Sequence, residues 1–94
     1  MPAKAVEWIE AADYYSSLHV KGRTFMLRET ISTLGRQLDP TIFVRVHRSA
    51  IVNLNYVREI LREGPDEGTV FLLDGQRLRM SRAGRQKLNE ILHS

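Results

Sequence analysis

The fold is decided by one stretch of the sequence, Phe43-Val44-Arg45-Val46-His47-Arg48-Ser49-Ala50-Ile51-Val52-Asn53. Its two apolar pieces, residues 43–46 and 50–52, are rich in valine and isoleucine, which suit the pleated, half-buried surface of a β-strand. The polar triplet 47–49 interrupts them. We therefore expect two strands joined by a polar loop.

The loop between these strands carries the first candidate functional residues. Arginine in such a loop can hold a phosphate or make a bidentate contact to guanine, so Arg48 is a candidate DNA ligand. Its neighbours Arg45 and His47 are weaker candidates, and a partly buried His47 that bonds to the backbone fits its position equally well. Ser49 and Asn53 are expected to be turn and backbone partners, as short polar side chains often are.

The flanking sequence predicts further short strands and two helices. On the N-terminal side, β-branched and aromatic residues predict strands at 6–9, 14–20 and 23–28, and Lys21-Gly22 predicts a hairpin between the last two. Ile31, Leu34 and Leu38 recur at helical spacing, after a possible N-cap at Thr30 and before Asp39-Pro40. On the C-terminal side we expect strands at 57–61, 69–73 and 77–80, with a loop at 64–68 and a hairpin turn at Asp74-Gly75. A helix should follow Ser81, with Leu88, Ile91 and Leu92 on one face. The layout predicts a mainly β fold.

Length and composition define the class of protein. A chain of 94 residues fits one domain with one core, and 43% hydrophobic with 27% charged residues is typical of a globular domain. Without cysteine, the chain has no disulfides or Cys-based zinc sites. No apolar run approaches the roughly 20 residues that cross a bilayer, and no signal peptide begins the sequence, so a cytoplasmic location is expected.

The charges are segregated along the chain. The net charge is only +3, but residues 40–58 and 76–89 contain no acid and together carry most of the arginines of the C-terminal half. Such segregation can produce a positive face that attracts a polyanion. On charge alone, an ordinary solvated surface remains the alternative.

Two arginines stand at an unfavourable position in Ser81-Arg82-Ala83-Gly84-Arg85. A helix N-terminus carries a partial positive charge, so Arg82 and Arg85 each cost about 0.3–1 kcal/mol there. A bound phosphate would reverse the sign of this interaction, because exposed backbone N–H groups and arginines would then act together. The alternative is a tolerated surface cost.

Three other residues complete the candidate set. Tyr14 and Tyr15 begin a strand, and alternation should bury one of them, so core packing competes with a role in binding. Lys21, at a hairpin turn, has solubility as its ordinary explanation.

Catalytic motifs are absent, and the three histidines have no ligand-like spacing, so neither an enzyme, a metal site nor a cofactor is expected.

The stretch 43–53 closely resembles the central signature of LytTR domains. It is joined by Glu10-Ala11 with Asp13-Tyr14, by residues 72–75, and by Arg79-Met80-Ser81-Arg82, in the matching order. The resemblance covers residues 6–92, which we expect to be the domain, with 1–5 as an extension and 93–94 as a tail. It implies an elongated fold of small antiparallel sheets with two short helices. Ala50 is smaller than the residue often found there.

The resemblance also implies a function. LytTR domains are output modules of bacterial response regulators, and their loops enter successive major grooves of DNA. Contacts in the family come from the loop opening the second strand, the loop after the Phe-x-Arg-x-His run and the loop before the last helix, here Tyr14 or Tyr15, Arg48 and Arg82. The implied partners are double-stranded DNA at paired direct repeats, a second copy on DNA, and a receiver domain where the chain is part of a longer regulator.

Two alternatives remain open. One is a module of the same fold that mediates protein interactions without binding DNA, against which the retained Arg48 and Arg82 argue. The other is an RNA binder, which is disfavoured because the sequence lacks the aromatic motif of the usual single-strand readers.

Overall fold

The computed structural model describes residues 3–92. Over this range the strands are β1 Trp8–Ala12, β2 Tyr15–Val20, β3 Arg23–Leu27, β4 Phe43–His47, β5 Ala50–Asn53, β6 Val57–Glu63, β7 Glu67–Leu72 and β8 Arg77–Met80. The helices are α1 Ile31–Gln37 and α2 Arg82–Leu92, and two short 3-10 helices are η1 Ala3–Ala5 and η2 Leu54–Tyr56. The expected tail, residues 93–94, lies outside the described residues.

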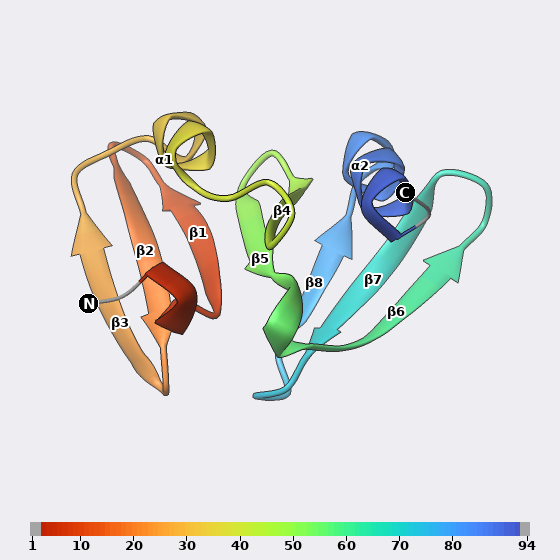
Figure 1. Cartoon of the computed structure of the whole chain (residues 1–94), viewed down its shortest axis with the longest axis horizontal. Helices are drawn as coiled ribbons and strands as arrows, with labels where there is room; N and C mark the ends of the chain where they lie inside the picture. Colours follow the sequence, from red (N-terminus) through yellow and green to blue (C-terminus); the bar gives the residue numbers. More distant parts are fainter. Residues whose placement is uncertain (1–2, 93–94) are drawn as a thin grey trace.

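The strands form two antiparallel sheets, which stand side by side in Figure 1. The larger sheet has the order β3-β2-β1-β5-β4, and the smaller has β6-β7-β8. The molecule is elongated, with extents of 35 × 24 × 24 Å. The expected mainly β, elongated fold with two short helices is therefore confirmed.

Side chains on opposite faces of the larger sheet build two separate cores, as strand alternation requires. One core lies between this sheet, the smaller sheet and α2, and consists of Trp8, Val44, Val46, Ala50, Val52, Val70, Leu72, Met80 and Leu88. The other lies under α1 and consists of Val6, Ile9, Ile31, Leu34, Phe43 and Ile51. The stretch 43–53 contributes to both, because β4 and β5 are covered on both faces. This explains why its apolar pieces are nearly continuous.

The first strand lies later in the chain than the sequence predicts. Residues 6–9 were expected, but β1 runs from Trp8 to Ala12 and includes Glu10-Ala11-Ala12, which have little β-propensity. The reason is tertiary, because β1 pairs with β2 along its whole length and with β5 over its first three residues. Pairing on both sides therefore outweighs local propensity at this position.

Both helices have the expected starts. Thr30 caps α1 by accepting a hydrogen bond from Thr33 N at 3.1 Å, and Ser81 Oγ accepts from Gly84 N at 3.2 Å at the start of α2. At the other end of α1, Leu38 is already extended rather than helical. There the Thr41 hydroxyl and backbone N–H donate to the Asp39 carboxylate, which lowers the pKa of this group below its ordinary value.

Helix α2 lies against β4 at a glycine. A Cβ atom built on Gly84 would stand 2.1 Å from the carbonyl oxygen of Val46. Only glycine allows this approach, and the approach brings the start of α2 to the end of β4, where Ser81 N donates to Val46 O at 2.8 Å. Gly84 therefore fixes the position of Arg82 relative to the β4–β5 turn.

Candidate nucleic-acid interface

Strand topology gathers four loops at the same end of the strands, along one long side of the molecule (Figure 1). The β1–β2 turn lies beside the β4–β5 turn, because Ala11 N donates to Ser49 O at 2.9 Å. The β4–β5 turn lies beside the start of α2 through the bond between Ser81 and Val46. The start of α2 in turn contacts the β6–β7 turn, as described below. We call these segments, residues 13–14, 48–49, 64–66 and 81–82, the four-loop end; in Figure 1 they lie along the upper side of the molecule, spread along its long axis.

The β1–β2 turn presents two exposed tyrosines. Tyr14 lies in the two-residue turn after Asp13, whose φ of 54° is left-handed, and its side chain is 80% exposed. Tyr15 is the first residue of β2 and is 42% exposed. The prediction that one of them would be buried is wrong, since the sheet interior begins only at Ser16. Both rings are available to a ligand at this end.

The β4–β5 turn holds Arg48 outward and is supported by the two residues that sequence reasoning grouped with it. Ser49 N donates to His47 Nδ1 at 3.2 Å, and Arg45 Nη2 donates to the carbonyl of Arg48 at 2.5 Å. Arg45 also bonds through Nη1 to Ser32 Oγ at 3.0 Å, which ties the turn to α1. The exposed side chain of Arg48 has no hydrogen bond or ion pair with any residue in the described range 3–92. Arg45 and His47 thus position the turn, and Arg48 projects from it.

The start of α2 holds two arginines with different roles. Arg82 is 74% exposed, and its Nε lies 3.5 Å from Oδ1 of Asp66 in the β6–β7 turn. Arg85 is half-buried and donates from Nη1 to the carbonyls of Gly64 and Glu67, at 2.7 and 3.2 Å. Arg85 therefore fastens the β6–β7 turn to α2. Arg82 stays at the surface, where its exposed ion pair with Asp66 can be exchanged for a contact with another anion.

Asp66 is the residue of this end that sequence reasoning missed. The turn 64–68 was predicted as a loop, but nothing in the sequence places it beside Arg82, because the two lie on elements that meet only in the tertiary structure. The structure adds a carboxylate to an end otherwise marked by arginines. This matters for binding, since a carboxylate that neutralises Arg82 also repels phosphate.

The sequence was also compared with models of known protein families. The family model of the LytTr DNA-binding domain matches residues 1–93. The chain belongs to the LytTR family. Its expected assignment to a DNA-binding family, and not to an enzyme family, is thereby confirmed.

Relatives of this LytTR domain are longer proteins. It is 30% identical over 79 residues to the sensory transduction protein LytT of Bacillus subtilis, covering 80% of this chain and 33% of that protein. It is 32% identical over 90 residues to the CO-responsive transcriptional regulator RcoM of Rhodospirillum rubrum, covering 93% of this chain and 37% of that protein. The chain thus spans about a third of the length of these relatives.

The fold is also found in a solved structure. The LytTr DNA-binding domain of a response regulator from Bacillus cereus superposes with a TM-score of 0.89 at 22% sequence identity, covering 100% of this chain and 86% of the other. At this identity the likeness concerns the fold, which is the LytTR fold expected from the sequence.

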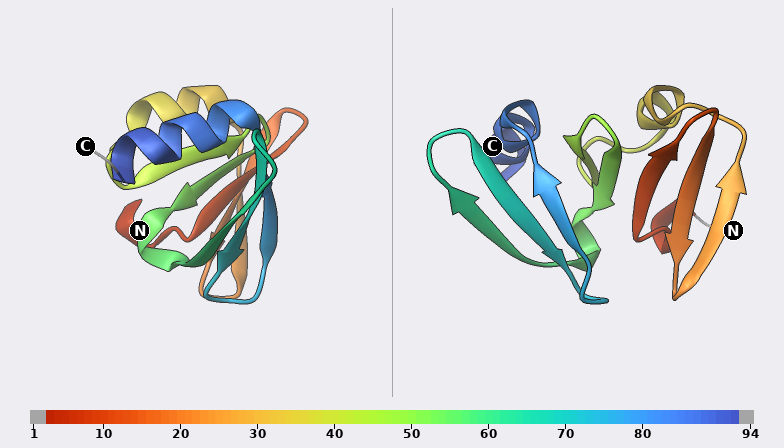
Figure 2. Two further views of the ribbon diagram at one scale, coloured as in Figure 1. Left: turned by 90° about the vertical axis from the view of Figure 1, so that its right-hand side faces the viewer. Right: turned by 180° about the vertical axis from the view of Figure 1, so that it is seen from behind.

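The structure does not bring Lys21 together with the other candidates of this LytTR domain. Lys21 and Gly22 form the β2–β3 turn, both with positive φ, of 47° and 78°. Because successive turns of antiparallel strands lie at alternate ends, this turn lies at the end of the larger sheet opposite Arg48, as the views in Figures 1 and 2 show. The backbone N–H of Lys21 donates to the buried carboxylate of Glu7 at 2.5 Å, so the turn has a structural role.

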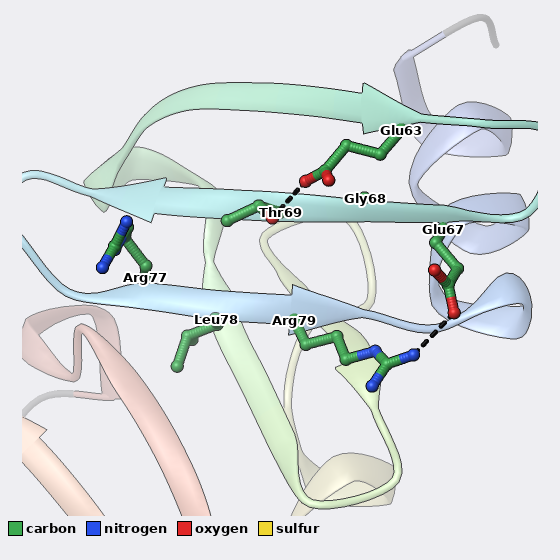
Figure 3. Close-up of a pocket in the computed structure, with 7 residues that line it drawn as sticks. All are labelled: Glu63, Glu67, Gly68, Thr69, Arg77, Leu78 and Arg79. Atoms are coloured by element: carbon green, nitrogen blue, oxygen red, sulfur yellow. Dashed lines mark hydrogen bonds and ion pairs between the residues drawn. The ribbon is translucent and has the colours of Figure 1, made fainter.

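The outer face of the smaller sheet carries a shallow hollow of about 420 Å³ whose charges are partly paired. Figure 3 shows Arg79 reaching Glu67 at 2.6 Å across β8 and β7, and Thr69 donating to Glu63 at 2.7 Å. Residues 3–92 contain no group of three or more His, Asp or Glu side chains placed to hold a metal ion. No helix within residues 3–92 is long and apolar enough to cross a membrane.

Proposed function

We propose that this LytTR domain binds duplex DNA sequence-specifically through the four-loop end, with Arg48 and Arg82 reading base edges in the major groove. The observation that carries the proposal is the placement of Arg48. Its backbone is held by Arg45 and His47, its side chain projects into solvent without a partner among the described residues, and it shares one end of the molecule with Arg82. A preorganised turn with an uncommitted guanidinium suits bidentate recognition of guanine.

The dimensions of the molecule fit successive grooves. The four loops are spread along the long axis, which measures 35 Å, and the helical repeat of B-DNA is about 34 Å. The β1–β2 turn lies near one end of this axis and the β6–β7 turn near the other, with the start of α2 between them (Figure 1), so the loops are suited to neighbouring major grooves on one side of the duplex. Tyr14 and Tyr15 would contact backbone or base at the first of these, and Arg82 would contact the second.

The biological setting belongs to the same proposal. The names of the relatives describe a sensory transduction protein and a CO-responsive transcriptional regulator, and this chain spans about a third of their length. We infer that the domain is the output part of a regulator in which another domain, such as a receiver, controls pairing on two direct repeats. Selection of genomic fragments with the purified domain tests this, because enriched sites should contain paired short repeats.

The first expected result concerns salt. Binding to a selected duplex should weaken steeply as salt rises, because each phosphate contact releases counterions and contributes about −0.9 to the slope of log K against log salt. A titration by fluorescence anisotropy at several salt concentrations measures this slope. Affinity that is indifferent to salt, or absent at low salt, would favour the alternative of a protein-interaction module.

Arg82→Ala should damage DNA binding without damaging the fold. The guanidinium opposes the dipole of α2 and forms only an exposed ion pair with Asp66, so its loss should change the free energy of unfolding by at most about 1 kcal/mol in either direction. Thermal unfolding and DNA titration of the same variant separate the two effects. A large loss of melting temperature with normal binding by the folded fraction would show that Arg82 is structural.

Asp66→Asn should raise the affinity for DNA a few-fold. The substitution removes a carboxylate that repels phosphate and frees Arg82, and exposed pairs of this kind are worth about 0.2–1 kcal/mol. Asp74→Asn is the matched control, because Asp74 is an exposed turn aspartate between β7 and β8, at the other end of the strands. If both variants gain equally, the effect is one of net charge and Asp66 has no local role.

A further inference from the structure

A groove of about 590 Å³ is lined by residues of α1, β4, β5 and α2, and Figure 1 shows the two helices standing apart with β4 between them. Its floor is apolar and comes from β4, β5 and α2, with Phe43, Val44, Ile51 and Ile91. Gly35 on α1 widens it, because this position has no side chain. A groove with an apolar floor between two helices is a common site for an amphipathic protein segment.

The charges around the groove have one dominant sign. Arg36, Arg45 and Lys87 line it, against a single carboxylate, Glu90. Within residues 3–92, none of these three cations forms an ion pair, since the recorded pairs involve His19, Arg79 and Arg82. The groove is therefore complementary to a negatively charged occupant.

Arg45 gives a second indication of a missing acceptor. Its Nη1 and Nη2 atoms bond to Ser32 and to the Arg48 carbonyl, but its Nε is buried and has no hydrogen-bond partner in the described part of the chain. A buried donor without a partner costs about 1–3 kcal/mol, so Arg45 adds an incompletely satisfied cation to the lining of the groove.

We propose that this groove docks an acidic amphipathic segment of a partner protein, with apolar side chains on the floor and carboxylates at Arg36 and Lys87. DNA is a poor occupant, because its phosphate backbone offers no apolar side for the floor. A second copy that docked through the same groove would set the three cations of one copy against those of the other. Neither Arg36 nor Lys87 belongs to the proposed DNA-contact set, so the inference stands apart from the proposed function.

The probe is a pair of fluorescein-labelled helical peptides of about four turns. Both carry leucine along one face, and the remaining positions are glutamate in one peptide and lysine in the other. The domain should bind the glutamate peptide, and the Arg36→Glu/Lys87→Glu double variant should bind it at least about tenfold more weakly, a loss of roughly 1.4 kcal/mol. Fluorescence anisotropy measures both affinities.

The matched control is the Arg23→Glu/Arg58→Glu double variant, which makes the same change of net charge at exposed arginines that do not line the groove. It should bind the glutamate peptide within about threefold of the unmodified domain, since neither arginine lines the groove and salt screens exposed charges that are not in contact with the peptide. Thermal unfolding of both double variants verifies that the measured protein is folded.

Three results would overturn the proposal. The first is equal binding of the glutamate and lysine peptides, and the second is an equal loss in the two double variants. The third is absence of binding of either peptide. Binding of naphthoate, a small aromatic anion, would then make the groove a site for small organic anions. A dimer in sedimentation that the groove variant dissociates would instead make it a self-association surface.

Discussion

Arg48→Ala is expected to weaken binding to a selected duplex by about 1–3 kcal/mol while leaving binding to random duplex much less affected. The physical reason is that a bidentate contact to guanine carries sequence information, whereas a phosphate contact does not. Folding should be unaffected within about 0.5 kcal/mol, because the side chain is exposed and has no partner among residues 3–92. Competition between the selected and the random duplex measures the ratio of affinities.

Lys21→Ala is the control for this experiment. Lys21 is also an exposed cation in a two-residue turn, but it lies at the opposite end of the larger sheet. Its removal should leave the ratio of specific to non-specific affinity unchanged. Equal weakening on both duplexes by Arg48→Ala would mean that this residue holds phosphate and does not read a base.

Gly84→Ala is expected to destabilise the domain by about 1–3 kcal/mol or more, although alanine is normally the better helix former by roughly 1 kcal/mol. The added methyl group would stand 2.1 Å from the carbonyl oxygen of Val46, and neither backbone can give way without moving α2 off β4. For a domain of this size each kcal/mol lowers the melting temperature by about 4–8 °C. Differential scanning calorimetry measures the loss.

The chain supplies its own comparison in Gly35→Ala. Gly35 also lies in a helix, but a Cβ atom there would meet only Ile51 Cδ1, at 3.4 Å, which is ordinary contact. This variant should be as stable as the unmodified domain or more stable, by up to about 1 kcal/mol. If Gly84→Ala were equally well tolerated, the close approach of α2 to β4 would not hold the start of the helix in place.

Most of the fold could be predicted because its signals are local. The Lys21-Gly22 turn, the cap at Thr30, the start of the last helix after Ser81, and the two strands of 43–53 follow from residue type and spacing, and the structure has each of them. Where prediction failed, a partner elsewhere in the chain decided the outcome. β1 extends to Ala12 because β2 pairs with it along its whole length and β5 pairs with its first three residues.

The candidate site was predictable in part for the same reason. Charge placement and the resemblance selected Arg48 and Arg82, whose exposed positions are local properties of a turn and a helix start. The supporting roles of Arg45 and Arg85 were not predictable, since their partners Ser32 and Gly64 lie 13 and 21 residues away. The ion pair of Arg82 with Asp66 was missed on the same ground, because no periodicity relates the two residues.

The most direct measurement of the central proposal is an amide NMR titration of the domain with a selected duplex. We expect the largest shift changes at the four-loop end, at Tyr14, Arg48, Asp66 and Arg82, and little change at Lys21-Gly22 and Asp74-Gly75. Changes concentrated at those two opposite turns, or spread evenly over the surface, would contradict binding through the four-loop end.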